Sequence, residues 1–115
     1  WYTEVWAGRI PVRGAGVMNL YLLTQSENND CDTWDSMIVA AETSEDARTI
    51  HPNNSTPYRL HIEWHDGEWV SRDSTGGINQ AYVHGWASSP DHVEAELIGS
   101  THLPRGIVIA SFNAG

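Results

Sequence analysis

Residues 19–41 read NLYLLTQSENNDCDTWDSMIVAA, two apolar runs separated by a polar segment. The first run, Asn19–Gln25, is short and rich in strand-forming residues. The second, Asp35–Ala41, alternates its side chains between two faces, and the polar segment Ser26–Asp32 is typical of a turn. The two runs are therefore predicted to form an antiparallel pair of strands.

A short helix is predicted directly after this pair. Thr43 is a favourable N-cap, and the acidic residue Asp46 follows three positions later, as in a capping box. The helix is expected over Ser44–His51, because Pro52 cannot continue it. Residues Pro52–Pro57 are expected to form a loop.

The segment Leu60–Arg72, LHIEWHDGEWVSR, carries the strongest local signal in the chain. Its central Asp-Gly dipeptide favours a two-residue type I′ turn between antiparallel strands. That turn fixes the facing pairs, which are His65–Glu68, Trp64–Trp69 and His61–Arg72.

The C-terminal part predicts further strands. Ser89-Pro90-Asp91 indicates a turn or a single helical turn. Val93–Ile98 alternates, with Val93, Ala95 and Leu97 expected to face inward. Gly106–Phe112 is almost wholly apolar and predicts a central strand covered on both faces. The fold class is therefore predicted as α+β, a mostly antiparallel sheet of four to six strands with one short helix packed on one face.

The chain has 115 residues and a mass of 12.8 kDa, which suits a single domain over residues 1–115. Residues 1–17 differ in composition from the rest and precede Met18, a candidate internal start. This N-terminal extension is expected to add an edge strand or an oligomerisation arm, held by Trp1 and Trp6.

The charge is strongly acidic, with 15 Asp and Glu against 6 Arg and Lys and a net charge of −9. This balance disfavours direct binding to nucleic acid and to anionic membranes, which both need basic groups. No apolar run approaches the roughly 20 residues of a membrane-spanning helix. The single cysteine, Cys31, excludes an internal disulfide and fits a cytoplasmic location.

Five stretches together resemble a family of small uncharacterised proteins from bacteria, phages and mobile elements, with an integron gene cassette as a possible source. They are MNLYLLTQ at 18–25, DTWDSMIVAA at 32–41, Ala47-Arg48 with Ile50-His51-Pro52, Ile98-Gly99, and GIVIASFNAG at 106–115. The segment 53–85 matches the family poorly. Cys31 and Trp34 stand where the family tends to have tyrosine. The family has no established activity, so the resemblance implies no function.

His61, Glu63 and His65 alternate along one strand face and are candidate metal ligands, because imidazole and carboxylate groups bind zinc or iron. The alternative is a solvated face on which His65 pairs with Glu68.

A second candidate is the acidic surface formed by Glu27, Asp30, Asp32 and Asp35. Such carboxylates bind calcium, act in acid–base catalysis, or satisfy turn backbone groups. The longer stretch Glu27–Asp46 has seven carboxylates and no basic residue. It could therefore mimic nucleic-acid phosphates. Flanking carboxylates make Cys31 a poor nucleophile.

Tryptophan is unusually frequent. Six indoles in 115 residues serve either as core or as an interface or pocket, where tryptophan is enriched. They are Trp1, Trp6, Trp34, Trp64, Trp69 and Trp86.

The chain has no lysine-bearing phosphate loop, no recognisable catalytic set and no implied cofactor. These features favour a small non-enzymatic interaction module that forms a homo-oligomer, with a dimer as the first expectation, and that could also take another protein partner. The alternatives are an acidic inhibitor of a host nucleic-acid enzyme and a metal-dependent or small-molecule-binding protein.

Overall fold

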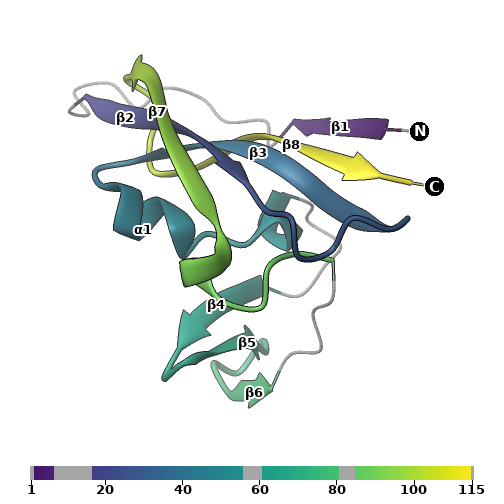
Figure 1. Cartoon of the computed structure of the whole chain (residues 1–115). Helices are drawn as coiled ribbons and strands as arrows, with labels where there is room; N and C mark the ends of the chain where they lie inside the picture. Colours follow the sequence, from purple (N-terminus) through teal and green to yellow (C-terminus); the bar gives the residue numbers. More distant parts are fainter. Residues whose placement is uncertain (1, 7–16, 56–60, 81–84, 115) are drawn as a thin grey trace.

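The computed structural model describes residues 2–6, 17–55, 61–80 and 85–114 and shows two antiparallel sheets (Figure 1). The larger sheet has the strand order β1-β8-β3-β2-β7, with bounds Tyr2–Trp6, Gly106–Asn113, Thr33–Ala41, Met18–Thr24 and Glu94–Thr101. The smaller sheet has the order β4-β5-β6, with bounds His61–His65, Glu68–Arg72 and Ile78–Gln80. The helical elements are α1 (Ser44–Arg48), and the 3₁₀ turns η1 (Pro52–Ser55) and η2 (Pro90–His92). The α+β class is confirmed, although the strands divide into two sheets instead of one.

The strand pair at the centre of the larger sheet is the one predicted from residues 19–41. β2 and β3 are antiparallel, and Leu22 lies opposite Ile38. β3 begins at Thr33, two residues earlier than expected, because Thr33 and Trp34 pair with the end of β8. The N–H of Trp34 also donates to the carbonyl of Gly85 at 2.7 Å. Contacts distant in sequence therefore lengthen this strand.

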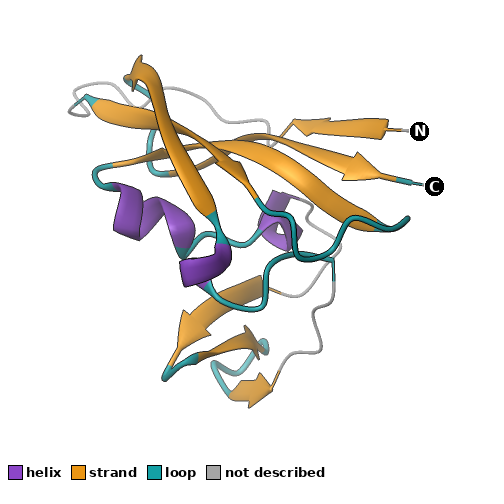
Figure 2. Ribbon diagram, viewed as in Figure 1, coloured by secondary structure: helices purple, strands orange, loops and turns teal. Residues whose placement is uncertain are grey.

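β8 was expected to be central and covered on both faces; it is an inner strand, as expected, but no described element covers its second face. β3 is the central strand, and β8 lies between β1 and β3. The helix α1, the turn η1 and the smaller sheet all lie on one side of the larger sheet (Figures 1 and 2). An apolar strand pattern shows that both faces avoid water, but it does not show what covers them.

The N-terminal segment adds an edge strand, as one of the two alternatives predicted. β1 pairs with β8, and Trp6 lies opposite Ile109 in the register. Trp1 lies outside the described residues, as does most of the extension. The oligomerisation arm stays a prediction.

The helix begins where the sequence predicts. The Thr43 hydroxyl accepts a hydrogen bond from the N–H of Asp46 at 3.1 Å. α1 ends at Arg48 instead of His51, and Pro52 begins η1 instead of a loop. The Asp46 carboxylate does not complete a capping box. It binds Arg105, with Oδ2 at 2.6 Å from Nε and Oδ1 at 2.9 Å from an Nη atom.

The hairpin of β4 and β5 is confirmed in register and turn type. Asp66 and Gly67 both have positive φ, at 50° and 82°, as a type I′ turn requires. Trp64 faces Trp69 edge-to-face, with the ring centroids 5.0 Å apart. Such a pair stabilises a hairpin by about 1 kcal/mol.

The core lies between the larger sheet and the elements on its covered side. Trp34, Trp69 and Trp86 are buried in it, and the Trp69 indole donates to the carbonyl of Ala87 at 2.9 Å. Val93 is buried as predicted. Leu97 was predicted to face inward but is 60% exposed, because it lies on the edge strand β7 without a covering element. Among the described residues, no helix is long and apolar enough to span a membrane.

Candidate functional site

The side of the larger sheet that faces away from α1 is apolar, and we name it the open face. Leu22, Ile38 and Ile109 form a row across its three inner strands. Leu20 continues the apolar surface along β2, and all four side chains are partly buried. A shallow hollow of about 220 Å³ lies over the row and is bordered by the paired residues Ser36 and Ser111.

The apolar row ends at the edge strand β7, where Glu96 lies opposite Leu22. Leu97 and Ile98 are 60% and 46% exposed at a β-bulge of this strand, and Leu97 lies opposite the core residue Tyr21, so it belongs to the uncovered edge of the other face. Monomeric proteins seldom expose contiguous apolar surface, so the row Leu22, Ile38 and Ile109 makes the open face a candidate interaction surface.

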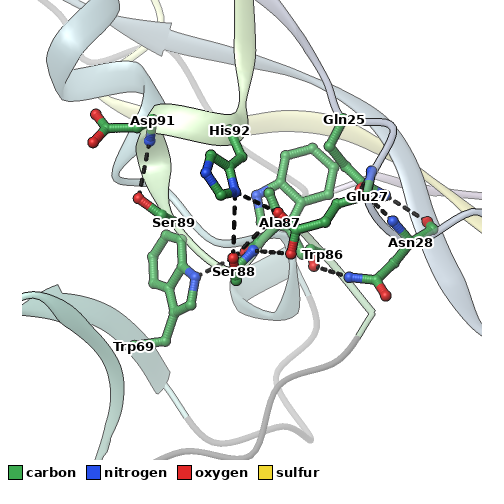
Figure 3. Close-up of polar contacts among 10 residues, drawn as sticks. All are labelled: Gln25, Glu27, Asn28, Trp69, Trp86, Ala87, Ser88, Ser89, Asp91 and His92. Atoms are coloured by element: carbon green, nitrogen blue, oxygen red, sulfur yellow. Dashed lines mark hydrogen bonds and ion pairs between the residues drawn. The ribbon is translucent and has the colours of Figure 1, made fainter.

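A polar cluster joins the turn after β2 to the turn before β7 (Figure 3). His92 Nδ1 lies 2.5 Å from Oε1 of Glu27. The hydroxyl of Ser88 donates to the same oxygen at 3.1 Å, and its N–H donates to Oε2 at 3.0 Å. Partial burial raises the pKa of Glu27, but the hydrogen bonds from His92 and Ser88 outweigh it and lower the pKa.

This cluster has a serine, a histidine and a carboxylate but not the geometry of a catalytic triad. The Ser88 hydroxyl lies 3.4 Å from Nδ1 of His92, the same nitrogen that contacts Glu27. A triad uses one ring nitrogen for the acid and the other for the serine. The cluster therefore links two turns that are distant in sequence, and it is not arranged to activate Ser88.

The predicted metal ligands do not converge. Glu63 is hydrogen-bonded by Arg72, which lowers the pKa of Glu63, and His61 Nε2 lies 3.6 Å from Oε2 of Glu63. The His65 side chain forms its ion pair with Asp66, at 3.2 Å, and not with its strand partner Glu68. Across the described ranges, no three His, Cys, Asp or Glu side chains form a group that could hold a metal ion. The face is solvated and paired by charge, as in the alternative reading.

The predicted acidic surface is divided among local roles. The carbonyl of Asp30 accepts from the Thr33 hydroxyl at 2.6 Å, and Asp32 adopts a positive φ of 61° in the turn. Asp35 Oδ1 is buried and has no hydrogen-bond partner among the described groups. Glu27 belongs to the cluster with His92, and Cys31 is an exposed free thiol.

The tryptophans separate by environment. Trp34, Trp69 and Trp86 are core residues, whereas Trp64 is partly buried and borders a cleft. An interface role for Trp6 stays a prediction.

That cleft has a volume of about 540 Å³ and lies between β4 and the start of β8. His61–Trp64 form one wall and Arg105–Ile107 the other, with Thr49, Ile50 and Asn54 between them. The hydrogen bond to Asp46 raises the pKa of Arg105 and keeps its guanidinium charged. This cleft was not predicted from the sequence, because Arg105 and Asp46 are 59 residues apart and no local pattern links them.

No family model matches the chain, and comparison with the curated proteins and with the solved structures found no match. The resemblance to proteins of mobile elements therefore stays a prediction.

Proposed function

We propose that this protein is a non-enzymatic interaction module that forms a homodimer through its open face. The observation that carries the proposal is the uninterrupted row Leu22, Ile38 and Ile109, which no described element covers. Burial of such side chains is the main favourable term in protein association.

The dimensions of the sheet suit a modest dimer. Five strands spaced by about 4.8 Å, each about 25 Å long, present roughly 600 Å² on one face. This is close to the lower limit of stable interfaces, which bury about 600–800 Å² on each partner. A two-fold axis would pack one open face on its copy, as two sheets pack face to face.

Charge opposes this association. Two copies with a net charge of −9 repel each other, and salt screens that repulsion. A homodimer held by apolar contacts should therefore become tighter as salt increases. An acidic inhibitor bound to a basic enzyme should show the opposite dependence.

The experiment is sedimentation velocity of the full chain at 20 and 500 mM NaCl. Wild type is expected to be dimeric, with tighter association at the higher salt. Ile38→Glu should be monomeric in both buffers, because it places a carboxylate at the centre of the open face. Ile78→Glu is the matched control, since Ile78 is exposed on β6, outside the open face.

A wild-type protein that remains monomeric at about 100 μM would contradict the proposal. So would an Ile38→Glu variant that associates like wild type. A lysate protein that binds at low salt and is released at high salt would instead favour the acidic inhibitor. Glu27 is paired with His92, and Asp46 is paired with Arg105. Fewer carboxylates are therefore left to mimic phosphates in the inhibitor role.

A further inference from the structure

The cleft beside β4 runs along a strand edge. Four successive residues, His61–Trp64, line it, whereas the side chains of a strand alternate between two faces. A cavity that touches four residues in a row must follow the edge of the strand. β4 pairs with β5 on one side, and no described strand pairs with it on the other. The cleft therefore gives access to main-chain hydrogen-bonding groups.

The side chain of Asn54 already occupies part of this edge. Its Oδ1 accepts from the N–H of Ile62 at 2.8 Å, and its Nδ2 donates to the carbonyl of Ile62 at 2.7 Å. One residue of a neighbouring antiparallel strand would make this same pair of bonds. The carboxamide of Asn54 thus takes the place of a strand at Ile62.

The main-chain groups of Trp64 point the same way as those of Ile62, because residues two apart in a strand share a direction. The turn agrees. A type I′ hairpin makes the flanking pair, His65 and Glu68, the hydrogen-bonded one, so Trp64 and Trp69 form the non-bonded pair. Within the described part of the chain, the N–H and carbonyl of Trp64 have no partner across the cleft.

The other wall of the cleft is also a strand edge. The pairing of β1 with β8 ends at Ile109, so the first residues of β8, from Gly106, have no described strand on that side. The side chains of Ile50 and Ile107 are buried between the two walls. The apolar base and the two edges fit a short extended chain.

The charges at the rim are compensated within the protein. Asp46 binds Arg105, and Glu63 binds Arg72. A ligand with a net charge would gain little from these paired groups. The cleft therefore favours a neutral ligand that both donates and accepts hydrogen bonds, as a peptide group does.

We propose that this cleft binds an extended, uncharged peptide segment, which pairs with the N–H and carbonyl of Trp64 as Asn54 pairs with Ile62. Strand addition of this kind draws its affinity from main-chain bonds and its selectivity from the neighbouring pockets. A volume of about 540 Å³ lies within the range of pockets that bind small ligands. The site is separate from the open face and does not depend on the proposed function.

The test uses the ¹⁵N-labelled full chain and the probe acetyl-Val-Ala-Val-methylamide. Titration should move the amide resonance of Trp64 to a limiting value. At ten times the Kd, the N–H of Trp64 should exchange about tenfold more slowly, because only free protein exchanges. The exchange of the Ile62 N–H, already bonded to Asn54, should not change. The same peptide N-methylated at all three residues should not bind.

Two surface variants locate the site. His61→Trp should weaken peptide binding at least tenfold, because it fills the cleft. His65→Trp should leave binding unchanged, because His65 lies on the same strand but does not line the cleft. Both histidines are exposed, so neither change disturbs the core.

Four results would overturn the proposal. The first is a peptide that shifts only resonances elsewhere, and the second is an N-methylated peptide that binds equally well. Binding of acetamide without the peptide would assign the cleft to a small amide. The fourth is protection of the Trp64 N–H from exchange in the free protein, which would show that this chain already occupies the edge. Protection that rises with protein concentration would assign the occupant to a second copy of the chain.

Discussion

Leu22 and Leu23 are neighbours on β2, yet they lie on opposite faces of the larger sheet and in different surroundings. Leu23 is fully buried beneath the covering elements, whereas Leu22 is partly exposed on the open face. Both positions carry the same apolar side chain. The difference shows that an apolar residue in a strand indicates a side chain that is packed against another surface. Only the fold tells whether that surface belongs to the same chain.

The largest effect is expected on the covered face. Trp86 is completely buried in the core. Trp86→Ala should lower the free energy of unfolding by about 3–5 kcal/mol, through lost burial and the cavity left behind. Urea denaturation followed by far-UV circular dichroism measures this loss. A loss below about 1 kcal/mol would show that the covered face is not the core of the fold.

The two leucines give the sharpest comparison. Leu23→Ala should cost about 2–5 kcal/mol of unfolding free energy, because a cavity forms in packed surroundings. Leu22→Ala should cost under about 1 kcal/mol in the monomer, since its site can take up solvent. Unfolding at protein concentrations well below the dimer Kd measures both values. Equal losses would mean that the open face is also packed within the monomer.

The smallest effect concerns the Glu27 cluster, which lies at the rim of the sheet. The pKa of Glu27 is lowered in the folded state, so its carboxylate stabilises the fold above the unfolded pKa of 4.5. That contribution is lost as the pH falls through the folded pKa. Because the site is near the surface, Glu27→Gln should cost about 0.5 kcal/mol at pH 7.

Unfolding experiments from pH 7 down to pH 2.5 would follow this effect. The stability difference between Glu27→Gln and wild type should disappear at the acidic end. A difference that stays constant across this range would assign the effect to packing instead of charge.

The features that the sequence predicted correctly depend on neighbouring residues. Thr43 caps a helix because its hydroxyl accepts a hydrogen bond from the N–H of Asp46, only three residues away. Asp66 and Gly67 define the turn and register of their hairpin because both adopt positive φ. Such local preferences act in any context and can be read along the chain.

The features that were missed depend on distant residues. Arg105 meets Asp46 across 59 positions, and His92 meets Glu27 across 65. No spacing rule links such pairs, because the fold alone brings them together. The apolar pattern of Gly106–Phe112 likewise predicted an inner strand but not which strands flank it. The cleft and the open face both follow from this strand order.

The strand order also has a consequence for how the chain folds. β2 and β3, the two strands joined by the short turn, lie in the middle of the larger sheet, while β1 reaches its partner β8 only across more than a hundred residues. The entropy cost of closing a loop increases with its length. The β2–β3 pair should therefore form early, β7 and β8 should add on either side of it, and β1 should join last. The sheet would grow from its centre outward.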